Sequence, residues 1–132
     1  MKSEQEPPAT PFHLLGGHPT FVAICGRFYD LMESKAEFAD LRAMHAANLD
    51  PMRTALPLFL AGWAGGPRDW FEANPGRCMM SVHERFRMTP KVAKQWADAM
   101  SRAIADVAPQ PAELAQAMSE ALAKLALGMG RD

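Results

Sequence analysis

The segment CMMSVHERFRMT, residues 78–89, holds the residue with the clearest potential for chemistry. His83 lies between a methionine-rich run and an alternation of arginine and phenylalanine. A neutral imidazole is a good ligand for iron. Apolar side chains near it in sequence can line a cofactor pocket, and arginines can bind carboxylates at its rim. The pocket candidates are Met79, Met80, Val82, Phe86 and Met88, and the rim candidates are Arg77, Arg85 and Arg87. A polar histidine on a surface loop is the alternative interpretation of His83.

Other kinds of reactive site are not indicated by the pattern. The histidines His13, His18, His45 and His83 show no i, i+4 pair, and Cys25 and Cys78 form no CxxC. A zinc site is therefore disfavoured. The sequence shows no catalytic triad, no paired carboxylates and no phosphate-binding glycine loop, so we predict no catalytic side chain.

Three further polar side chains can face a pocket. Tyr29, the only tyrosine, follows Phe28 at the edge of an apolar stripe, and Trp96 lies on another such stripe. A buried hydroxyl or indole N–H needs a partner and can donate into a pocket, although each residue could equally be a core residue bonded to backbone. His45 ends a predicted helix, where it can interact with the helix dipole.

The elements that must position these residues are helical. Apolar residues recur at intervals of three and four from residue 21 to residue 32, with Pro19 near the start. Residues 36–45 predict a shorter helix. Asp50 is predicted to be the N-cap of a third helix, which ends at the Gly-Gly-Pro sequence of residues 65–67. Pro57 inside this helix should remove one backbone hydrogen bond and kink it.

Two longer helices are predicted in the C-terminal half, one starting at Thr89-Pro90 and one starting near Pro111 and ending by Gly128. Between Pro67 and Thr89 the pattern is irregular, with room for one helical turn around His83. No segment alternates with period two over a convincing length, so the fold class is all-α. A structureless stretch of this length inside a small domain needs an explanation, and a ligand that replaces missing core is one.

Length and composition limit the class of protein. The 132 residues fit one domain, which we predict over residues 12–132, with residues 1–11 as a flexible N-terminal tail. The net charge of −1 argues against nucleic acid or an anionic membrane as the main partner. No apolar run is long enough for a membrane span. The two cysteines form no disulfide framework, so a reducing, cytoplasmic location is expected.

Taken together, the order of several motifs resembles the truncated haemoglobins, and within them the second group. The motifs are LLGGHPTF, GRFYDLM, LRAMH, LFLAGWAGGPRDW, His83 followed by Phe86, and Trp96 in KQWADAM. They cover roughly residues 12 to 127. The resemblance implies a shortened globin fold, a two-over-two helical sandwich that encloses haem b, with a loop before the proximal histidine.

The resemblance also implies roles for particular residues. His83 would ligate the haem iron, and Tyr29 and Trp96 would donate hydrogen bonds to the bound ligand. His45 would line the distal pocket, and Met52 and Leu56 would face the iron. The cofactor contacts would be completed by Phe59, Trp70, Met80, Arg85, Phe86 and Met88. The residues just before the histidine are often basic in the family, but here they are Met80, Ser81 and Val82. Arg53, Arg68 or Arg85 would therefore have to anchor the haem propionates.

The function that follows is binding of O2 and related diatomic ligands, for oxygen binding or for detoxification of NO or peroxide. Tyr29, Trp96 and His45 offer up to three donors, which would slow ligand release. An NO dioxygenase or peroxidase-like activity would need a separate reductase, because the sequence has no flavin or nicotinamide motif. Two alternatives remain open: a haem-free helical interaction or sensor module, and an electron carrier ligated by His83 and Met52. A six-coordinate resting iron, with Met52 or His45 as sixth ligand, is also compatible with the sequence.

Overall fold

The computed structural model describes residues 10–75 and 88–130. In chain order these residues form α1 (Pro11–Leu14), α2 (His18–Ser34), the 3-10 helix η2 (Ala36–Phe38), α3 (Ala39–Ala43), α4 (Asp50–Trp63), α5 (Asp69–Ala73), α7 (Pro90–Val107) and α8 (Ala112–Gly128). The described ranges contain no strand, which confirms the predicted all-α class. Within those ranges no helix has the length and apolar character needed to cross a membrane.

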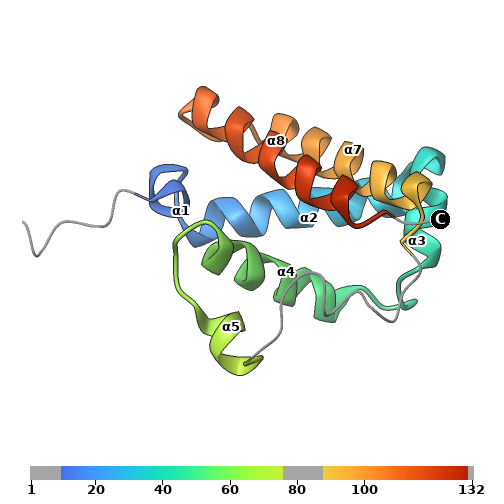
Figure 1. Cartoon of the computed structure of the whole chain (residues 1–132), viewed down its shortest axis with the longest axis horizontal. Helices are drawn as coiled ribbons and strands as arrows, with labels where there is room; N and C mark the ends of the chain where they lie inside the picture. Colours follow the sequence, from blue (N-terminus) through green and yellow to red (C-terminus); the bar gives the residue numbers. More distant parts are fainter. Residues whose placement is uncertain (1–9, 76–87, 131–132) are drawn as a thin grey trace, which may run out of the picture.

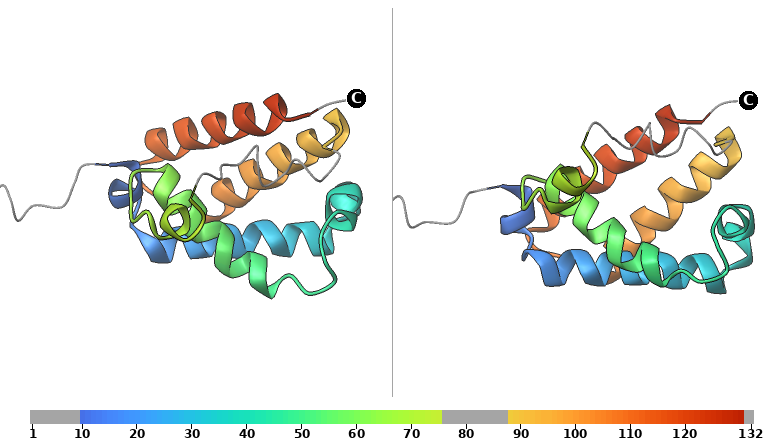
Figure 2. Two further views of the ribbon diagram at one scale, coloured as in Figure 1. Left: turned by 60° about the horizontal axis from the view of Figure 1, so that its bottom comes forward. Right: turned by 90° about the horizontal axis from the view of Figure 1, so that it is seen from below.

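The helices pack as two pairs. Helices α7 and α8 run side by side, and α4 packs on α2 (Figures 1 and 2). The two pairs meet where α2 packs on α7. The chain just after α8 lies close to the start of α7. A Cβ added at Gly130 would lie only 3.0 Å from the Cα of Pro90. Helix α5 packs on α4, away from the α7–α8 pair (Figure 1).

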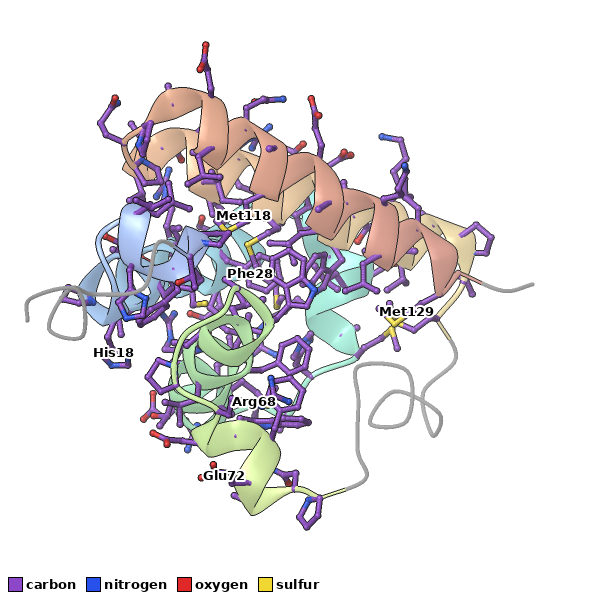
Figure 3. The ribbon with its side chains drawn as sticks, turned by 60° about the vertical axis from the view of Figure 1, so that its left-hand side comes forward. His18, Phe28, Arg68, Glu72, Met118 and Met129 are labelled. Carbon is purple, nitrogen blue, oxygen red and sulfur yellow. The ribbon has the colours of Figure 1, made fainter. Side chains whose placement is uncertain are left out.

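Helix α2 forms the centre of the core, as its periodicity predicts. All of its predicted apolar positions are buried: Phe21, Ile24, Cys25, Phe28, Leu31 and Met32. Figure 3 shows Phe28 and Met118 in the interior beneath α8, whereas His18 and Glu72 lie at the periphery. Each large apolar side chain buried in this way stabilises the fold by about 1.5–3 kcal/mol. Cys25 is fully buried, so it packs as a small core residue.

Helices α7 and α8 begin where the sequence predicts. Thr89 is the N-cap of α7, and its hydroxyl accepts a hydrogen bond of 3.2 Å from the backbone N–H of Val92. The predicted stripe of α7 is buried except for its last residue, Val107, which is partly exposed. Helix α8 begins after Pro111 and ends at Gly128.

Helix α4 differs in detail from the prediction. Asp50 is the first helical residue and Leu49 occupies the N-cap position without a side-chain cap, so the prediction of Asp50 as N-cap was wrong. The backbone N–H of Asp50 donates to Asn48 Oδ1 over 3.0 Å, so a side chain before the helix binds one of the N–H groups that lack an intrahelical partner. Pro57 is buried inside the helix, and α4 continues through it.

The sequence pattern did not predict the short helices α1 and α5, and it predicted one helix where the structure has η2 followed by α3. Residues 36–45 form η2 and α3, and His45 lies just beyond the end of α3. Residues 69–73, expected to be loop, form α5, and Pro11, expected to lie in the tail, begins α1. The remainder of the predicted tail and the predicted turn around His83 lie outside the described residues.

Candidate functional site

A cavity of about 450 Å³ opens between α2, α4, α5, α7 and the segment of residues 44–48. This volume is within the range of about 300–1,000 Å³ that is usual for small-molecule and cofactor sites. Its lining is mostly apolar and aromatic: Tyr29, Leu41, Met44, His45, Ala46, Asn48, Pro51, Met52, Ala55, Leu56, Phe59, Trp70, Met88 and Trp96.

The structure brings together every predicted site residue that it describes. Tyr29, His45, Met52, Leu56, Phe59, Trp70, Met88 and Trp96 all line the cavity. His83, Met80, Arg85 and Phe86 lie outside the described residues. Sequence reasoning missed Leu41, Met44, Ala46, Asn48, Pro51 and Ala55. The helical spacing of three and four along Met52, Ala55, Leu56 and Phe59 could have found Ala55, whereas residues 44–48 carry no periodic signal.

Tyr29 and Trp96 form what we call the donor wall of the cavity. Both are nearly buried, and Phe28 packs edge-on against each, with ring centroids 4.9 Å from Tyr29 and 5.4 Å from Trp96. Neither polar group makes a hydrogen bond within the described residues, and no described side-chain polar atom is sealed in protein without a partner. The phenol O–H and the indole N–H therefore both remain available to donate to a ligand in the cavity.

Burial raises the pKa of Tyr29 well above its ordinary value, because the ionised form would lose hydration. The nearby Cys25 adds to this increase, and the guanidinium of Arg53 opposes it. The hydroxyl therefore stays protonated at neutral pH and is a hydrogen-bond donor there.

One ring nitrogen of His45, Nδ1, is hydrogen-bonded to the protein backbone. Its Nδ1 lies 2.9 Å from the backbone carbonyl of Leu41, and a carbonyl only accepts, so Nδ1 carries the proton. In the neutral imidazole Nε2 then has a lone pair and accepts rather than donates. The ring meets that of Tyr29 edge-on at 6.0 Å between centroids. A neutral His45 in this tautomer has no second N–H to donate, whereas a protonated His45 has one.

A second part of the cavity lining, which we call the aromatic wall, consists of Leu56, Phe59 and Trp70. Phe59 and Trp70 meet edge-on at 5.0 Å between ring centroids, and Phe71 lies 5.3 Å from Phe59 and 5.0 Å from Trp70. Gly62 allows this packing, because a Cβ there would lie 2.6 Å from the Phe71 ring. Aromatic packing therefore docks α5 on α4 and places Trp70 at the cavity.

The two described arginines expected near cofactor carboxylates behave differently. The guanidinium of Arg53 binds Asp30 Oδ1 at 2.9 Å and Glu33 Oε1 at 3.3 Å on α2, so this side chain is already paired. Arg68 lies over the Phe71 ring, 4.5 Å from its centroid, on the side of α5 (Figure 3). Arg68 is exposed, and it is the better placed of the two to meet an anionic group at the aromatic wall.

Among residues 10–75 and 88–130, no group of three His, Cys, Asp or Glu side chains could hold a metal ion. A metal in this cavity would need a ligand from the rest of the chain or a cofactor that brings it. The volume and the lining of the cavity suit such a cofactor, because a large flat apolar group gains most from aromatic and aliphatic contacts on its faces.

Comparison with known proteins identifies the family. The model of the bacterial-like globins matches residues 10–130, and the chain belongs to this family. No curated protein sequence matches it significantly.

Several solved structures have the same fold. The cold-adapted truncated haemoglobin of the Antarctic bacterium Pseudoalteromonas haloplanktis is 28% identical, with a TM-score of 0.87, 93% of this chain covered and 98% of that one. The group II 2-on-2 haemoglobin of Agrobacterium tumefaciens is 26% identical, with a TM-score of 0.88 and coverage of 96% and 97%. The group II truncated haemoglobin of Bacillus anthracis, 24% identical, superposes with a TM-score of 0.83 over 94% and 98% of the two chains.

These findings confirm the predicted fold, a truncated globin with two helices packed over two, and the resemblance to the second group. The family also makes the protein a haem-binding globin that binds a diatomic ligand. The haem-free module and the electron carrier are accordingly not favoured.

Proposed function

We propose that this globin binds haem b in the described cavity and holds O2 or a related diatomic ligand against the donor wall. The observation that supports this most directly is the pair of unengaged donors, Tyr29 and Trp96, facing one cavity with otherwise apolar lining. The haem supplies the iron at which the gas binds and leaves. The chain supplies the dry pocket and the donors.

In this proposal Leu56, Phe59, Trp70 and Met88, all of which line the cavity, would hold the haem. His83 would ligate its iron, with Met80, Phe86 and Arg85 nearby in sequence. His45 and Met52 close the distal side next to Tyr29. Arg68 or Arg85 faces the propionates, because Arg53 is paired with Asp30 and Glu33.

Two donors in a water-poor pocket favour slow release of a polar ligand. Each hydrogen bond contributes about 1–1.5 kcal/mol, or roughly tenfold in residence time. Slow release suits holding or reacting with the ligand better than delivering it in bulk. We therefore propose oxygen binding, or conversion of NO or peroxide, with electrons from a separate reductase in the cytoplasm.

Absorption spectra test the proposal. The haem-loaded protein should show a strong Soret band as ferric and as dithionite-reduced protein, and a clean shift when CO is added. His83→Ala should lose this band. A reduced spectrum that CO leaves unchanged would point instead to a His/Met-ligated iron, with Met52 as the second ligand.

The domain boundaries stay a prediction, with residues 12–132 as the globin domain and residues 1–11 as a tail. Limited proteolysis of the haem-loaded protein followed by mass spectrometry would locate the first protected residue.

A further inference from the structure

An ionic network connects three segments that line the cavity. Arg53, on α4, donates to the backbone carbonyl of Gly26 over 3.2 Å and to Asp30 over 2.9 Å, both on α2. The same guanidinium reaches Oε1 of Glu33 at 3.3 Å. Helix α4 is thereby tied to α2 by one side chain with three partners.

Arg42 extends this network to the segment before α4. Its guanidinium lies 3.7 Å from Oε2 of Glu33 and donates to the backbone carbonyls of Ala46 over 3.0 Å and Ala47 over 2.9 Å. The carboxylate of Glu33 therefore lies between an arginine of α4 and an arginine of α3. We call these contacts the Arg53–Glu33–Arg42 network.

Members of the network are sequence neighbours of cavity residues. Arg53 follows Met52, Asp30 follows Tyr29, and Ala46, itself in the lining, follows His45. The Arg53 guanidinium also lies 5.8 Å from the centroid of the Tyr29 ring. A shift of the network would move the backbone that carries the distal residues.

The first turns of α4 depend on such external contacts. The N-cap position, Leu49, makes no side-chain cap. Pro57 has no N–H to donate to the backbone carbonyl of Arg53, so the internal ladder of the helix is interrupted there. Within the described residues, Arg53 makes the only side-chain hydrogen bonds from α4 to another segment. Met52 and Ala55 lie in these first turns, next to the contacts that Arg53 makes with α2.

We propose that the Arg53–Glu33–Arg42 network positions Tyr29 and the segment of residues 44–48 against α4, and thereby sets the rate at which a bound ligand leaves. The inference rests on the proposed function, in which Tyr29 is the donor to the ligand. Arg53 and Glu33 are positioning residues, since neither lines the cavity.

The network should control geometry more than stability. Its side chains are 30% exposed for Arg53, 45% for Glu33 and 57% for Asp30, and exposed ion pairs add little to the free energy of unfolding. Salt screens such pairs over about 8 Å at physiological ionic strength and more strongly above it. Ligand release should therefore depend on salt only while the network is intact.

The test compares two arginines that each join α2 to another helix. Arg53→Met removes the contacts of Arg53 with Gly26, Asp30 and Glu33 and keeps an unbranched apolar side chain, while the Arg42–Glu33 contact remains. Arg27→Met removes the 2.8 Å pair with Asp106 of α7, whose two side chains are 44% and 39% exposed. Glu33→Gln is a second disruption that leaves both arginines in place.

The first measurement is the dissociation rate of O2 from the reduced, haem-loaded protein, by stopped-flow replacement with CO at 0.05 M and 0.5 M salt. We expect Arg53→Met and Glu33→Gln to accelerate release by about three- to tenfold and to abolish its salt dependence. Arg27→Met should behave like the unmodified protein. In a Tyr29→Phe background, Arg53→Met should have little further effect.

The second measurement does not depend on ligand release. The chain contains a single tyrosine, so tyrosine labelled with ¹³C at Cζ gives one resonance that needs no assignment. Arg53→Met should shift or broaden this resonance with and without haem, and Arg27→Met should not.

The outcomes distinguish failure of the donor role of Tyr29 from failure of the proposed role of the network. If Tyr29→Phe leaves O2 release unchanged, Tyr29 is not the donor and both the donor assignment and this inference are wrong. If Tyr29→Phe accelerates release but Arg53→Met behaves like Arg27→Met, only the inference is overturned.

Discussion

The donor wall and the aromatic wall of the cavity are built in different ways. Tyr29 and Trp96 come from α2 and α7, two long helices that pack on each other in the core, and they are 2% and 8% exposed. Trp70 comes from the five-residue helix α5 and is only partly buried. A helix this short has no stability of its own and exists through its docking.

This difference indicates which wall of the cavity depends on a bound cofactor for its packing. The donors lie on α2 and α7, which pack on each other through many buried side chains. The rings of the aromatic wall have neighbours on one side and the cavity on the other, so they lack packing partners unless something fills it. We expect haem to organise the aromatic wall and to find the donor wall already in place.

Removal of haem should have the largest effect. A ligand that binds only the folded state at about a thousand times its Kd adds about 4 kcal/mol to the free energy of unfolding. Hydrogen exchange should show that the loss of protection is concentrated in α5 and the second half of α4, while α2 and α7 change little. Equal loss of protection in α2 and α5 would show that the two walls depend on haem to the same extent.

Phe59→Ala should have the next largest effect. Phe59 is 6% exposed and holds Trp70 and Phe71, so its truncation should cost about 3 kcal/mol of stability in denaturant unfolding of the haem-free protein. Phe21→Ala is the matched control, because Phe21 is 1% exposed and packs on Phe12 away from the cavity. Both variants should be destabilised, but only Phe59→Ala should lose haem faster to an excess of apomyoglobin. Equal haem loss from both would mean that the aromatic wall has no special role.

Tyr29→Phe should change ligand release and leave stability almost unchanged. The hydroxyl makes no hydrogen bond within the described residues, so its removal should alter the free energy of unfolding by less than about 1 kcal/mol. Release of O2 should be about tenfold faster, equivalent to about 1.4 kcal/mol. Release of the less polar CO, measured on the same samples, should change much less. A large loss of stability would show that Tyr29 serves the core instead.

The smallest effect concerns pH. Burial raises the pKa of both Tyr29 and Cys25 in the folded protein. A raised folded-state pKa means that the stabilisation is complete below the unfolded-state pKa and is lost as pH rises above it. The unfolded values are about 8.5 for cysteine and about 10 for tyrosine. Between pH 6 and pH 8, tyrosine ionisation should therefore leave O2 release unchanged. Denaturation midpoints should fall above about pH 9, and Tyr29→Phe should reduce the fall above pH 10.

Much of the donor wall could be predicted from local pattern. The spacing of Phe21, Phe28 and Met32 identifies the inner face of α2 and places Tyr29 beside it, and Thr89-Pro90 marks the start of the helix that carries Trp96. These signals are readable because long amphipathic helices repeat their burial every three or four residues. The globin resemblance rested on motifs in these segments together with LFLAGWAGGPRDW, which ends at Trp70 of the aromatic wall.

The aromatic wall and the ionic network were less accessible. Asp69 was taken as loop because α5 is too short to show a period, and its helix depends on aromatic docking across Gly62. Arg53 was offered with Arg68 and Arg85 as a partner of haem carboxylates, since nothing in the sequence links it to Asp30 and Glu33, which lie 23 and 20 residues earlier. His45 was counted as a donor because its residue type does not reveal the bond of Nδ1 to Leu41.

The sequence by itself determined the all-α class, the long helices α2, α7 and α8, and a set of candidate site residues. It could do so because helix periodicity and end signals are local properties of the chain. Only the tertiary structure decided which of these side chains face one cavity. It also decided that Nδ1 of His45 is hydrogen-bonded to Leu41 and that Arg53 joins α4 to α2. Those properties depend on distances between segments far apart in sequence, and the packing of the helices sets these distances.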